Sequence, residues 1–439
     1  MPASLIQRLT SELQATPVAR QIGRIQSLNA GRVTVKGIEK AARPGDRVSL
    51  PGQSVGGEII ALDTDSVTVL PEGPVEGLSL DMPVLLDGPP FIWPDDSWLG
   101  RIVDPNGEAL DGRVITKGAV ARALASEPIN PANRRGLGKR IQTGLSVFDT
   151  VLPLVRGQRL GLFAGAGVGK STLVGRLATG VEADVTVVAL IGERGREVRE
   201  FTQDILGPEG MRRAVVVAAT ADRSPLLRRR CADAALAVAE HFRDLGKHVL
   251  LLADSVTRYA DAHREIALQS GENAAMRGHP PSMAARVMAL AERAGPGDVQ
   301  TAGDITAIIS VLEAGSDMEE PEADTLRGVL DGHVVRNRDF ADRGRFPAVD
   351  VGRSVSRALP GAATGPENGL INAVRASLGH YERNEMMVRA GLYTSGSDPT
   401  LDEAIRIWPA LDAFFASRSD GVDDSFARLQ DILTPVPPS

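Results

Sequence analysis

Apolar and polar residues alternate in short runs between residues 21 and 95. Two examples are residues 32–35 (Arg-Val-Thr-Val) and 66–70 (Ser-Val-Thr-Val-Leu), and turns that contain Gly and Pro separate such runs. A period of two residues is typical of strands with one buried face. This segment is therefore predicted to be a small β-barrel or β-sandwich.

A different pattern follows between residues 140 and 357, where apolar runs of strand length alternate with helical spacing. These runs cover residues 159–163, 185–192, 214–218, 248–253 and 305–312. Alternation of this kind predicts parallel strands covered by helices, which places this part in the α/β class. One helix has well-defined ends, because Ser224 suits the N-cap, Pro225 the first helical position and Gly246 the residue after the last turn.

Helical spacing without strands marks both ends of the chain. After Gly369 the strand-like runs stop, and one helix is expected to start at Ser397-Asp-Pro and to continue to Trp408. At the other end, residues 1–18 carry an apolar stripe formed by Leu5, Ile6, Leu9 and Leu13. The stripe fits two interpretations: a helix that packs on its own domain, or a helix that docks on a partner or a membrane surface.

The composition is that of a soluble, multidomain enzyme. The 439 residues allow roughly three domains, and the chain is 43% hydrophobic and 24% charged. Its net charge is -7, so the chain lacks the excess of basic residues that is typical of proteins that bind nucleic acids. The single cysteine, Cys231, cannot form an intrachain disulfide. We therefore expect it to be an unreactive core residue of a cytosolic protein.

Targeting signals are not evident. The N-terminal residues lack the basic start, apolar centre and small-residue cleavage site of a secretory signal. No apolar run approaches the roughly 18 residues that a membrane span requires. We therefore expect a soluble or peripheral protein.

A glycine-rich turn joins the apolar run 159–163 to a helical pattern. Three glycines at alternate positions precede Lys170 and Ser171, namely Gly165, Gly167 and Gly169. Such glycines let backbone N–H groups curl around a phosphate, and the helix N-terminus adds the positive end of its dipole. Lys170 would contact the β- and γ-phosphates, and Ser171 would bind Mg²⁺. Ala164 departs from the strict P-loop pattern, but strand, loop and helix follow in the required order.

Two carboxylates follow other strand-like runs. Asp254 comes directly after the run 248–253, and Glu193 comes directly after the run 185–192. Asp254 is expected beside the P-loop, where it would hold Mg²⁺ through water, and Glu193 is expected to orient and polarise the attacking water. The charged residues 194–200 also fit a solvated helix face.

Other catalytic and metal-binding motifs are absent from the sequence. The six histidines never take H-E-x-x-H or similar spacing, and there is no cysteine pair and no G-x-S-x-G motif. The glycine run does not complete G-x-G-x-x-G, because Lys170 occupies the last position. The histidines are therefore expected to be structural.

Four sequence blocks occur together and in order, at residues 163–172, 192–197, 252–260 and 331–333. They read Phe-Ala-Gly-Ala-Gly-Val-Gly-Lys-Ser-Thr, Gly-Glu-Arg-Gly-Arg-Glu, Leu-Ala-Asp-Ser-Val-Thr-Arg-Tyr-Ala and Asp-Gly-His. Over nearly its whole length the chain resembles the flagellar type III protein-export ATPases, relatives of the rotary ATP synthase α and β subunits. The Phe-Ala-Gly form of the loop is usual in that family, which explains Ala164.

The resemblance implies four parts in the chain. A partner-binding helix is expected at residues 1–20, a β-barrel domain at 21–95, a RecA-like P-loop ATPase domain at 96–365 and a helical C-terminal domain at 366–439. The family also implies assembly of the chain into a homohexamer.

The resemblance further implies residues that bind Mg²⁺-ATP. The expected nucleotide-binding residues are Gly165, Ala166, Gly167, Val168, Gly169, Lys170, Ser171, Thr172 and Phe346. Phe346 takes the place where relatives have an aromatic ring against the adenine. Ser171 and Asp254 are the expected ligands of the metal.

Catalytic roles are implied in the same way. Glu193 resembles the catalytic glutamate, Lys170 the lysine at the phosphates and Arg194 a supporting arginine on the phosphate side. Arg357, in the sequence Ser-Val-Ser-Arg, resembles an arginine finger that one subunit inserts into its neighbour's site. Arg353 lies close by and is the alternative finger.

These roles describe a Mg²⁺-dependent ATPase that energises flagellar type III protein export. In the family, hydrolysis serves the release and unfolding of export substrates and their chaperones at the export gate. The N-terminal segment of such ATPases binds a regulatory stator-like export protein. The resemblance therefore implies a cytoplasmic protein, peripheral at the inner-membrane export apparatus, with no nucleic-acid partner.

Four alternatives use the same core. A virulence type III secretion ATPase shares these motifs. The catalytic subunit of a rotary ATP synthase fits less well, because the helical end around Gly396-Ser-Asp-Pro resembles the export family more closely. Relatives that form a non-catalytic, nucleotide-binding subunit replace the glutamate that this chain keeps as Glu193. The acidic balance and the aromatic-poor barrel segment argue against a hexameric RNA translocase.

Overall fold

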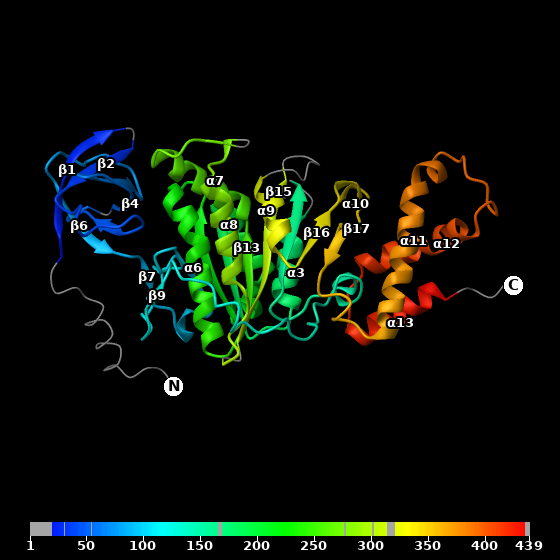
Figure 1. Ribbon diagram of the computed structural model, residues 1–439. Coiled ribbons are helices and arrows are strands. Elements are labelled where there is room, and N and C mark those ends of the chain that lie inside the picture. Colours follow the sequence, from blue (N-terminus) through cyan, green and yellow to red (C-terminus); the bar gives the residue numbers. More distant parts are fainter. Residues whose placement is uncertain are drawn as a thin grey trace.

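The structure is a computed structural model that describes residues 20–434, apart from residues 30, 54, 166–168, 276–277, 301–302 and 314–320. Figure 1 shows three parts in a row: an N-terminal group of strands, a central sheet flanked by helices, and a C-terminal group of helices. The partner-binding helix is expected at residues 1–20, and all of these except Arg20 lie outside the described residues.

The N-terminal strands close into a six-stranded barrel, with the order β1-β2-β5-β4-β3-β6, and the sandwich alternative is thereby excluded. The strands are β1 (Ile22–Asn29), β2 (Arg32–Lys36), β3 (Arg47–Ser49), β4 (Gly56–Leu62), β5 (Val67–Pro71) and β6 (Pro83–Gly88). Along β2, Val33 and Val35 are buried in the barrel core, whereas Thr34 between them is half-buried. The alternation of the sequence therefore matches the inside and outside of the barrel.

The central part is built on a sheet of nine strands in the order β17-β16-β10-β15-β13-β11-β12-β8, with β14 paired to β15. Its strands are β8 (Arg101–Val103), β10 (Arg159–Gly165), β11 (Val185–Glu193), β12 (Ala214–Thr220), β13 (His248–Asp254), β14 (Gly295–Pro296), β15 (Asp304–Glu313), β16 (Gly332–Arg336) and β17 (Val349–Ser356). The strands from β16 to β8 are parallel, and β14 and β17 are antiparallel to their neighbours. Every predicted strand-like run is confirmed as a strand of this sheet.

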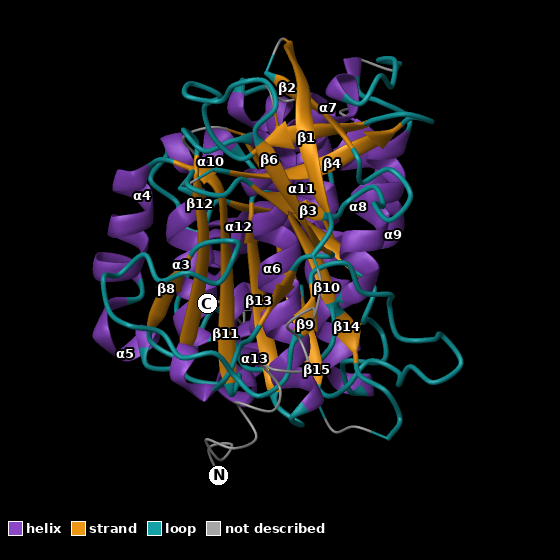
Figure 2. Ribbon diagram, turned by 90° about the vertical axis from the view of Figure 1, so that its left-hand side faces the viewer, coloured by secondary structure: helices purple, strands orange, loops and turns teal. Residues whose placement is uncertain are grey.

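Helices cover both faces of this sheet (Figure 2). They are α2 (Ser146–Asp149), α3 (Lys170–Gly180), α4 (Gly195–Glu200), the π-helix η2 (Phe201–Ile205), α5 (Gly207–Met211), α6 (Pro225–Asp244), α7 (Val256–Gln269), α8 (Ser282–Arg293), α9 (Pro321–Val329) and α10 (Arg338–Asp342). Along β11, Val187 and Ile191 pack in the core that contains α6, while Val188 and Leu190 pack in the core that contains α3. Continuous apolar runs are therefore buried on both faces, as in other parallel sheets.

The predicted boundaries of α6 are confirmed. The Ser224 hydroxyl accepts a hydrogen bond from the backbone N–H of Leu227, and Pro225 is the first helical residue. The helix ends before Gly246, whose φ of +84° is easily reached only without a side chain. A short 3-10 helix, η1 (Asp96–Trp98), and a two-stranded sheet of β7 (Phe91–Ile92) and β9 (Arg122–Ala123) connect the barrel to the central part.

Three helices form the C-terminal part: α11 (Gly365–Arg389), α12 (Pro399–Ala416) and α13 (Val422–Leu433). Asp398 caps α12 at the position where the sequence places a helix start. Ile371 of α11 and Leu411 of α12 belong to the same apolar core as Leu173 of α3. None of the helices in the described part of the chain is long and apolar enough to cross a membrane.

Candidate active site

The P-loop joins the end of β10 to the start of α3. Gly165 is the last residue of β10, and Gly169 is the N-cap of α3 with a φ of +71°. A Cβ atom at position 169 would lie 3.3 Å from Cε1 of Phe346 and 3.4 Å from Nη2 of Arg336. The backbone conformation therefore favours glycine, and a Cβ atom would fit only if the side chain of Phe346 or Arg336 shifted slightly. Ala166, Gly167 and Val168 of the expected loop lie outside the described residues.

Three charged side chains meet beside this loop. Lys170 forms an ion pair with Asp254, and its Nζ lies 3.7 Å from Oε1 of Glu193. Asp254 ends β13 and Glu193 ends β11, so both carboxylates lie at the carboxyl edge of the parallel sheet, as the sequence predicts. The hydroxyl of Ser310, on β15, donates a hydrogen bond of 2.7 Å to Oδ1 of Asp254 and so helps to orient it.

A β-bulge sets the direction of Glu193. The pairing of β11 with β12 shifts between Ile191 and Glu193, where Gly192 adopts a φ of +67°. A Cβ atom on Gly192 would lie only 3.1 Å from Cδ of Arg258. Bulges of this kind re-aim side chains next to active sites. Gly192 therefore lets the strand bend toward Lys170 and lets Arg258 approach closely.

The surroundings of Glu193 favour its protonated form more than water does. Burial, a hydrogen bond with Glu197 and the charge of Asp254 raise the pKa of Glu193 to about 7, against the opposing effects of Lys170 and Arg258. A carboxylate with a pKa near neutral can accept a proton from water more readily than one with an ordinary pKa. This agrees with the expected role of Glu193 as the group that activates water.

The residues at the start of α3 fit a magnesium ion bound together with a nucleotide. Ser171 and Thr172 are exposed in the first turn of α3, and Lys170, the first residue of that helix, forms the ion pair with Asp254. Among the described residues, no group of three or more acidic, histidine or cysteine side chains is arranged so that it could hold a metal ion by itself. Mg²⁺ commonly takes one or two protein ligands and completes its shell with water and phosphate oxygens.

Phe346 lies next to the P-loop, as the resemblance implies, and 41% of its surface is exposed. A base can stack on an aromatic ring that is exposed in this way.

Arg194 is the exposed N-cap of α4, and its backbone N–H donates a hydrogen bond of 3.3 Å to Oε2 of Glu197. The roles of Phe346 and Arg194 toward a nucleotide stay predictions.

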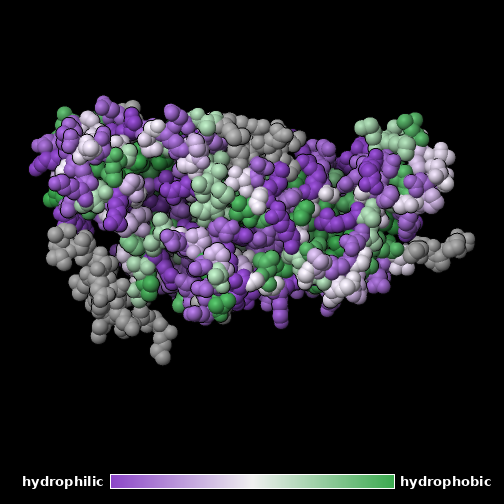
Figure 3. Space-filling view, in the orientation of Figure 1, coloured by the Kyte–Doolittle hydropathy of each residue, from purple (hydrophilic) through white to green (hydrophobic). Residues whose placement is uncertain are grey.

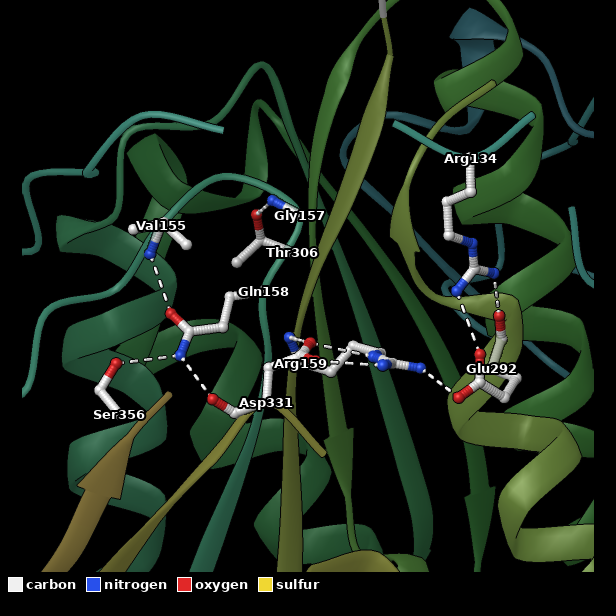
Figure 4. A network of polar contacts seen from close by, with 9 residues as sticks. All are labelled: Arg134, Val155, Gly157, Gln158, Arg159, Glu292, Thr306, Asp331 and Ser356. Carbon is white, nitrogen blue, oxygen red and sulfur yellow. Dashed lines mark hydrogen bonds and ion pairs between the residues drawn. The ribbon is translucent and has the colours of Figure 1, made fainter. Parts of the chain in front are cut away.

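Arg357 lies at the opposite edge of the sheet from the P-loop. β17 runs antiparallel to β16, so its last residue, Ser356, pairs with the first residue of β16. Figure 4 shows the polar network at this edge: Gln158 donates 3.1 Å hydrogen bonds to Ser356 and to the carbonyl of Asp331, and Arg159 pairs with the Asp331 carboxylate. The backbone N–H of Arg357 donates to the same carbonyl. Within one chain, Arg357 is therefore not part of the Lys170 cluster.

Sequence reasoning missed four residues around the site. Ser310, Glu197 and Arg258 contact or influence the two carboxylates, and Arg336 lies beside Gly169. Arg258 carried a usable signal, because it lies only four positions after Asp254, in the first turn of α7. Ser310 carried none, because its place beside Asp254 depends on the register of β13 with β15.

Cys231, His248 and His263 are buried, which agrees with the structural role expected of them. Cys231 is buried on α6, and burial raises the pKa of its thiol. Nε2 of His248 lies 2.8 Å from the Thr306 hydroxyl, and Nε2 of His263 lies 2.8 Å from the Ser282 hydroxyl. Burial lowers the pKa of both histidines, so they are neutral near pH 7.

Comparison with known proteins agrees with this geometry. Residues 144–356 match the nucleotide-binding domain of the ATP synthase alpha/beta family, and residues 366–431 match the EscN ATPase C-terminal domain of type III secretion systems. The flagellum-specific ATP synthase of Caulobacter vibrioides is 42% identical over 94% of this chain and 95% of its own length. The flagellum-specific ATP synthase of Salmonella typhimurium is 48% identical over 72% of this chain and 69% of its own length.

A solved structure shows the same fold. The assembled ATPase EscN, in complex with its central stalk EscO, from enteropathogenic E. coli superimposes with a TM-score of 0.86 at 35% identity, covering 94% of this chain and all of that one. The same family is indicated by the fold, the P-loop, the two carboxylates and the extended sequence identity. The chain is therefore an ATPase and belongs to the family of flagellum-specific ATP synthases.

Proposed function

We propose that this chain hydrolyses Mg²⁺-ATP and that hydrolysis energises flagellar type III protein export, by releasing and unfolding substrates and their chaperones at the export gate. The observation that carries the proposal is the meeting of Lys170, Glu193 and Asp254 beside the P-loop. The identity with flagellum-specific ATP synthases supports the flagellar system.

Each of the three side chains has a distinct task in hydrolysis. Lys170 leaves its ion pair with Asp254 when a triphosphate enters, and its ammonium group then neutralises charge on the β- and γ-phosphates. Glu193 orients the attacking water and accepts its proton. Ser171 and Asp254 would hold Mg²⁺, which when bound supplies positive charge to the phosphate oxygens.

The position of Arg357 supports a site that is completed by a second subunit. This exposed arginine lies at the sheet edge away from its own P-loop, so it can act only on the site of another chain. An arginine finger supplied in this way is worth about 10³ to 10⁵ in rate. EscN was solved as an assembled ATPase, which supports assembly of this chain as well. The assembly that we propose is the homohexamer that the resemblance to export ATPases implies.

The C-terminal helices offer a surface for a further partner. Met386 and Leu392 are 86% and 75% exposed near the connection of α11 to α12, where Figure 3 shows apolar residues at the upper right. EscN binds a central stalk, EscO. A stalk-like protein is the partner proposed for this surface, and a stator-like regulator is proposed for residues 1–20. The chain would act in the cytoplasm, peripherally at the inner membrane.

The first test is phosphate release from Mg²⁺-ATP by the full chain, compared between wild type, Lys170→Ala and Lys36→Ala. Lys36 is exposed at the end of β2 and serves as the matched control. Turnover by the wild type and by Lys36→Ala, with loss in Lys170→Ala, supports the ATPase. Equal turnover in all three would contradict the assigned site.

The second test concerns the export system. In the source bacterium, deletion of the gene is expected to abolish swimming, and Lys170→Ala is expected not to restore it. Normal swimming together with loss of secreted effectors would instead assign the chain to a virulence secretion system. Intact motility and secretion with impaired oxidative growth would point to a rotary ATP synthase.

A further inference from the structure

A buried arginine lies beside the P-loop on the side away from the Lys170 cluster. Arg336 is the last residue of β16, and only 5% of its surface is exposed. Its Nη2 lies 3.4 Å from the point that a Cβ on Gly169 would occupy, and Cε1 of Phe346 lies 3.3 Å from the same point. The guanidinium is thus at the junction of the last P-loop glycine and the exposed aromatic ring.

The strand order separates Arg336 from the groups that act on the terminal phosphate. β16 is adjacent to β10 on one side, whereas β15, β13 and β11 follow on the other side. Glu193 and Asp254 end β11 and β13. In the catalytic scheme proposed above, the terminal phosphate of a bound nucleotide would therefore lie over that side. Arg336 and Phe346 then face the other end of the nucleotide, where the α-phosphate joins the nucleoside.

We propose that Arg336 is a nucleotide-binding residue that contacts the nucleoside end of the substrate, at the α-phosphate or the sugar next to Phe346. The proposal rests on the nucleotide site proposed above and adds a binding group to it. A guanidinium forms strong, directional hydrogen bonds with phosphate oxygens. Because the side chain is already buried, it loses little conformational freedom when the ligand arrives.

The electrostatic setting favours an anionic ligand. Burial lowers the pKa of Arg336 to about 10, which leaves the side chain charged at neutral pH in a poorly solvated place. A phosphate beside Arg336 would offset part of its desolvation, and such contacts are stronger at low local dielectric.

The experiment measures binding and turnover of Arg336→Leu and Arg336→Lys in the full-length protein. Arg375→Leu is the control, because Arg375 is half-buried and burial lowers its pKa. Its guanidinium donates to the carbonyls of Val151 and Ser354, away from the P-loop. Dissociation constants for ATP, ADP and pyrophosphate are measured by calorimetry, together with KM, kcat and the melting temperature.

Arg336→Leu is expected to weaken the binding of ATP and of ADP to a similar extent, with dissociation constants raised about tenfold or more. The effect should appear in KM, with kcat changed less than about twofold, because the groups that activate water are untouched. Pyrophosphate, which lacks the nucleoside end, should bind as tightly as to wild type. Arg336→Lys, which keeps the charge but not the planar fork, should fall between Arg336→Leu and wild type.

Unchanged affinity for ATP and ADP in a folded Arg336→Leu would overturn the proposal, as would an equal loss of pyrophosphate binding. If Arg336→Leu fails to fold, Arg336→Lys decides by the same criteria. A comparable loss of affinity in Arg375→Leu would show that the effect is a general consequence of removing a buried arginine, and would also overturn it. If instead the proposed function is wrong, the wild-type protein itself binds no ATP, which distinguishes that outcome from a failure of the Arg336 proposal.

Discussion

At the scale of single residues, the reactivity of the site depends on the burial of Glu193 and on the charges around it. Burial is the largest cause of its raised pKa, and two other carboxyl groups and two cations also influence that pKa. Lys170 is close to both Glu193 and Asp254, so the entry of a triphosphate that draws Lys170 away changes the charge around both carboxylates. The site is therefore sensitive to pH and to the loss of a single charge.

The pH dependence of kcat/KM follows from the pKa of about 7. Only the ionised form of Glu193 can accept a proton from water, so kcat/KM should be constant above pH 7. Below pH 7 it should fall about tenfold for each pH unit, because the fraction of ionised Glu193 falls in that proportion. A profile measured from pH 5 to 9 with saturating Mg²⁺ tests this. A flat profile down to pH 5 would contradict the assignment.

Replacing Glu193 with glutamine should separate catalysis from folding. We expect Glu193→Gln to lower kcat by at least about 10² while nucleotide binding persists. The folded state raises the pKa of this carboxyl above its ordinary value of 4.5, so its ionisation costs stability as the pH rises from 4.5 through 7. Glutamine removes that cost. The melting temperature of the variant, relative to wild type, should therefore increase between pH 5 and pH 8.

The outcome that would contradict this view is wild-type turnover in Glu193→Gln. Glu200→Gln is the matched control, because Glu200 is exposed at the end of α4. It should leave both turnover and the pH dependence of the melting temperature unchanged.

At the scale of elements, the sequence pattern located the parts of the site but not their contacts. Continuous apolar runs predicted β10, β11 and β13, and the residues directly after or at the end of these strands became the P-loop, Glu193 and Asp254. The order of the strands across the sheet cannot be read from such local patterns. Neighbours such as Ser310 therefore appear only once β15 is known to lie between β10 and β13.

The P-loop geometry makes a specific prediction for Gly169→Ala. A methyl group there meets Phe346 and Arg336 at 3.3 and 3.4 Å and has to adopt a φ of +71°. We expect ATP affinity to fall by about tenfold or more, because the loop and its two neighbours must shift. Gly246→Ala is the control: its φ is +84°, but no atom lies within 4 Å of its Cβ position.

Both variants should lose a similar stability of about 1 kcal/mol from backbone strain, since both residues are in the left-handed region. Only Gly169→Ala should lose nucleotide affinity. Calorimetric titration with ATP and urea unfolding distinguish the two effects. Equal ATP affinity in the two variants would contradict the close packing described for Gly169.

At the scale of the whole molecule, buried ion pairs join the barrel to the ATPase core. Glu58 on β4 pairs with Arg229 and Arg230 of α6, and Arg230 also pairs with Glu72. Arg229 and Arg230 are 9% and 3% exposed. No local sequence pattern indicates this joint, because the acidic residues of the barrel and the basic residues of α6 are more than 150 positions apart.

Removal of one partner from this network should be costly. Glu58→Gln leaves two buried guanidinium groups without their shared carboxylate, and we expect a loss of about 3 kcal/mol in the free energy of unfolding. Glu209→Gln is the control, since Glu209 forms an exposed ion pair with Arg212 and should change stability by less than about 0.5 kcal/mol. Urea unfolding provides both values, and equal values would contradict a joint held by these ion pairs.

The resemblance to export ATPases indicated a role for Arg357 that no pattern within the chain could supply. The structure explains why: the residue belongs to the far edge of the sheet, where Asp331 and Ser356 hold the end of β17. A site completed by another subunit cannot be recognised from the contacts of one chain. The assembly therefore has to be tested in solution.

The most direct test is Mg²⁺-ATP turnover per chain, measured across a wide range of protein concentration for wild type, Arg357→Ala and Arg212→Ala. Arg212 is exposed on the surface near α5 and serves as the control. Turnover by the wild type and the control should rise steeply with concentration, and Arg357→Ala should lose about 10³-fold at every concentration. Turnover that is independent of concentration and equal in Arg357→Ala would contradict a site shared between subunits.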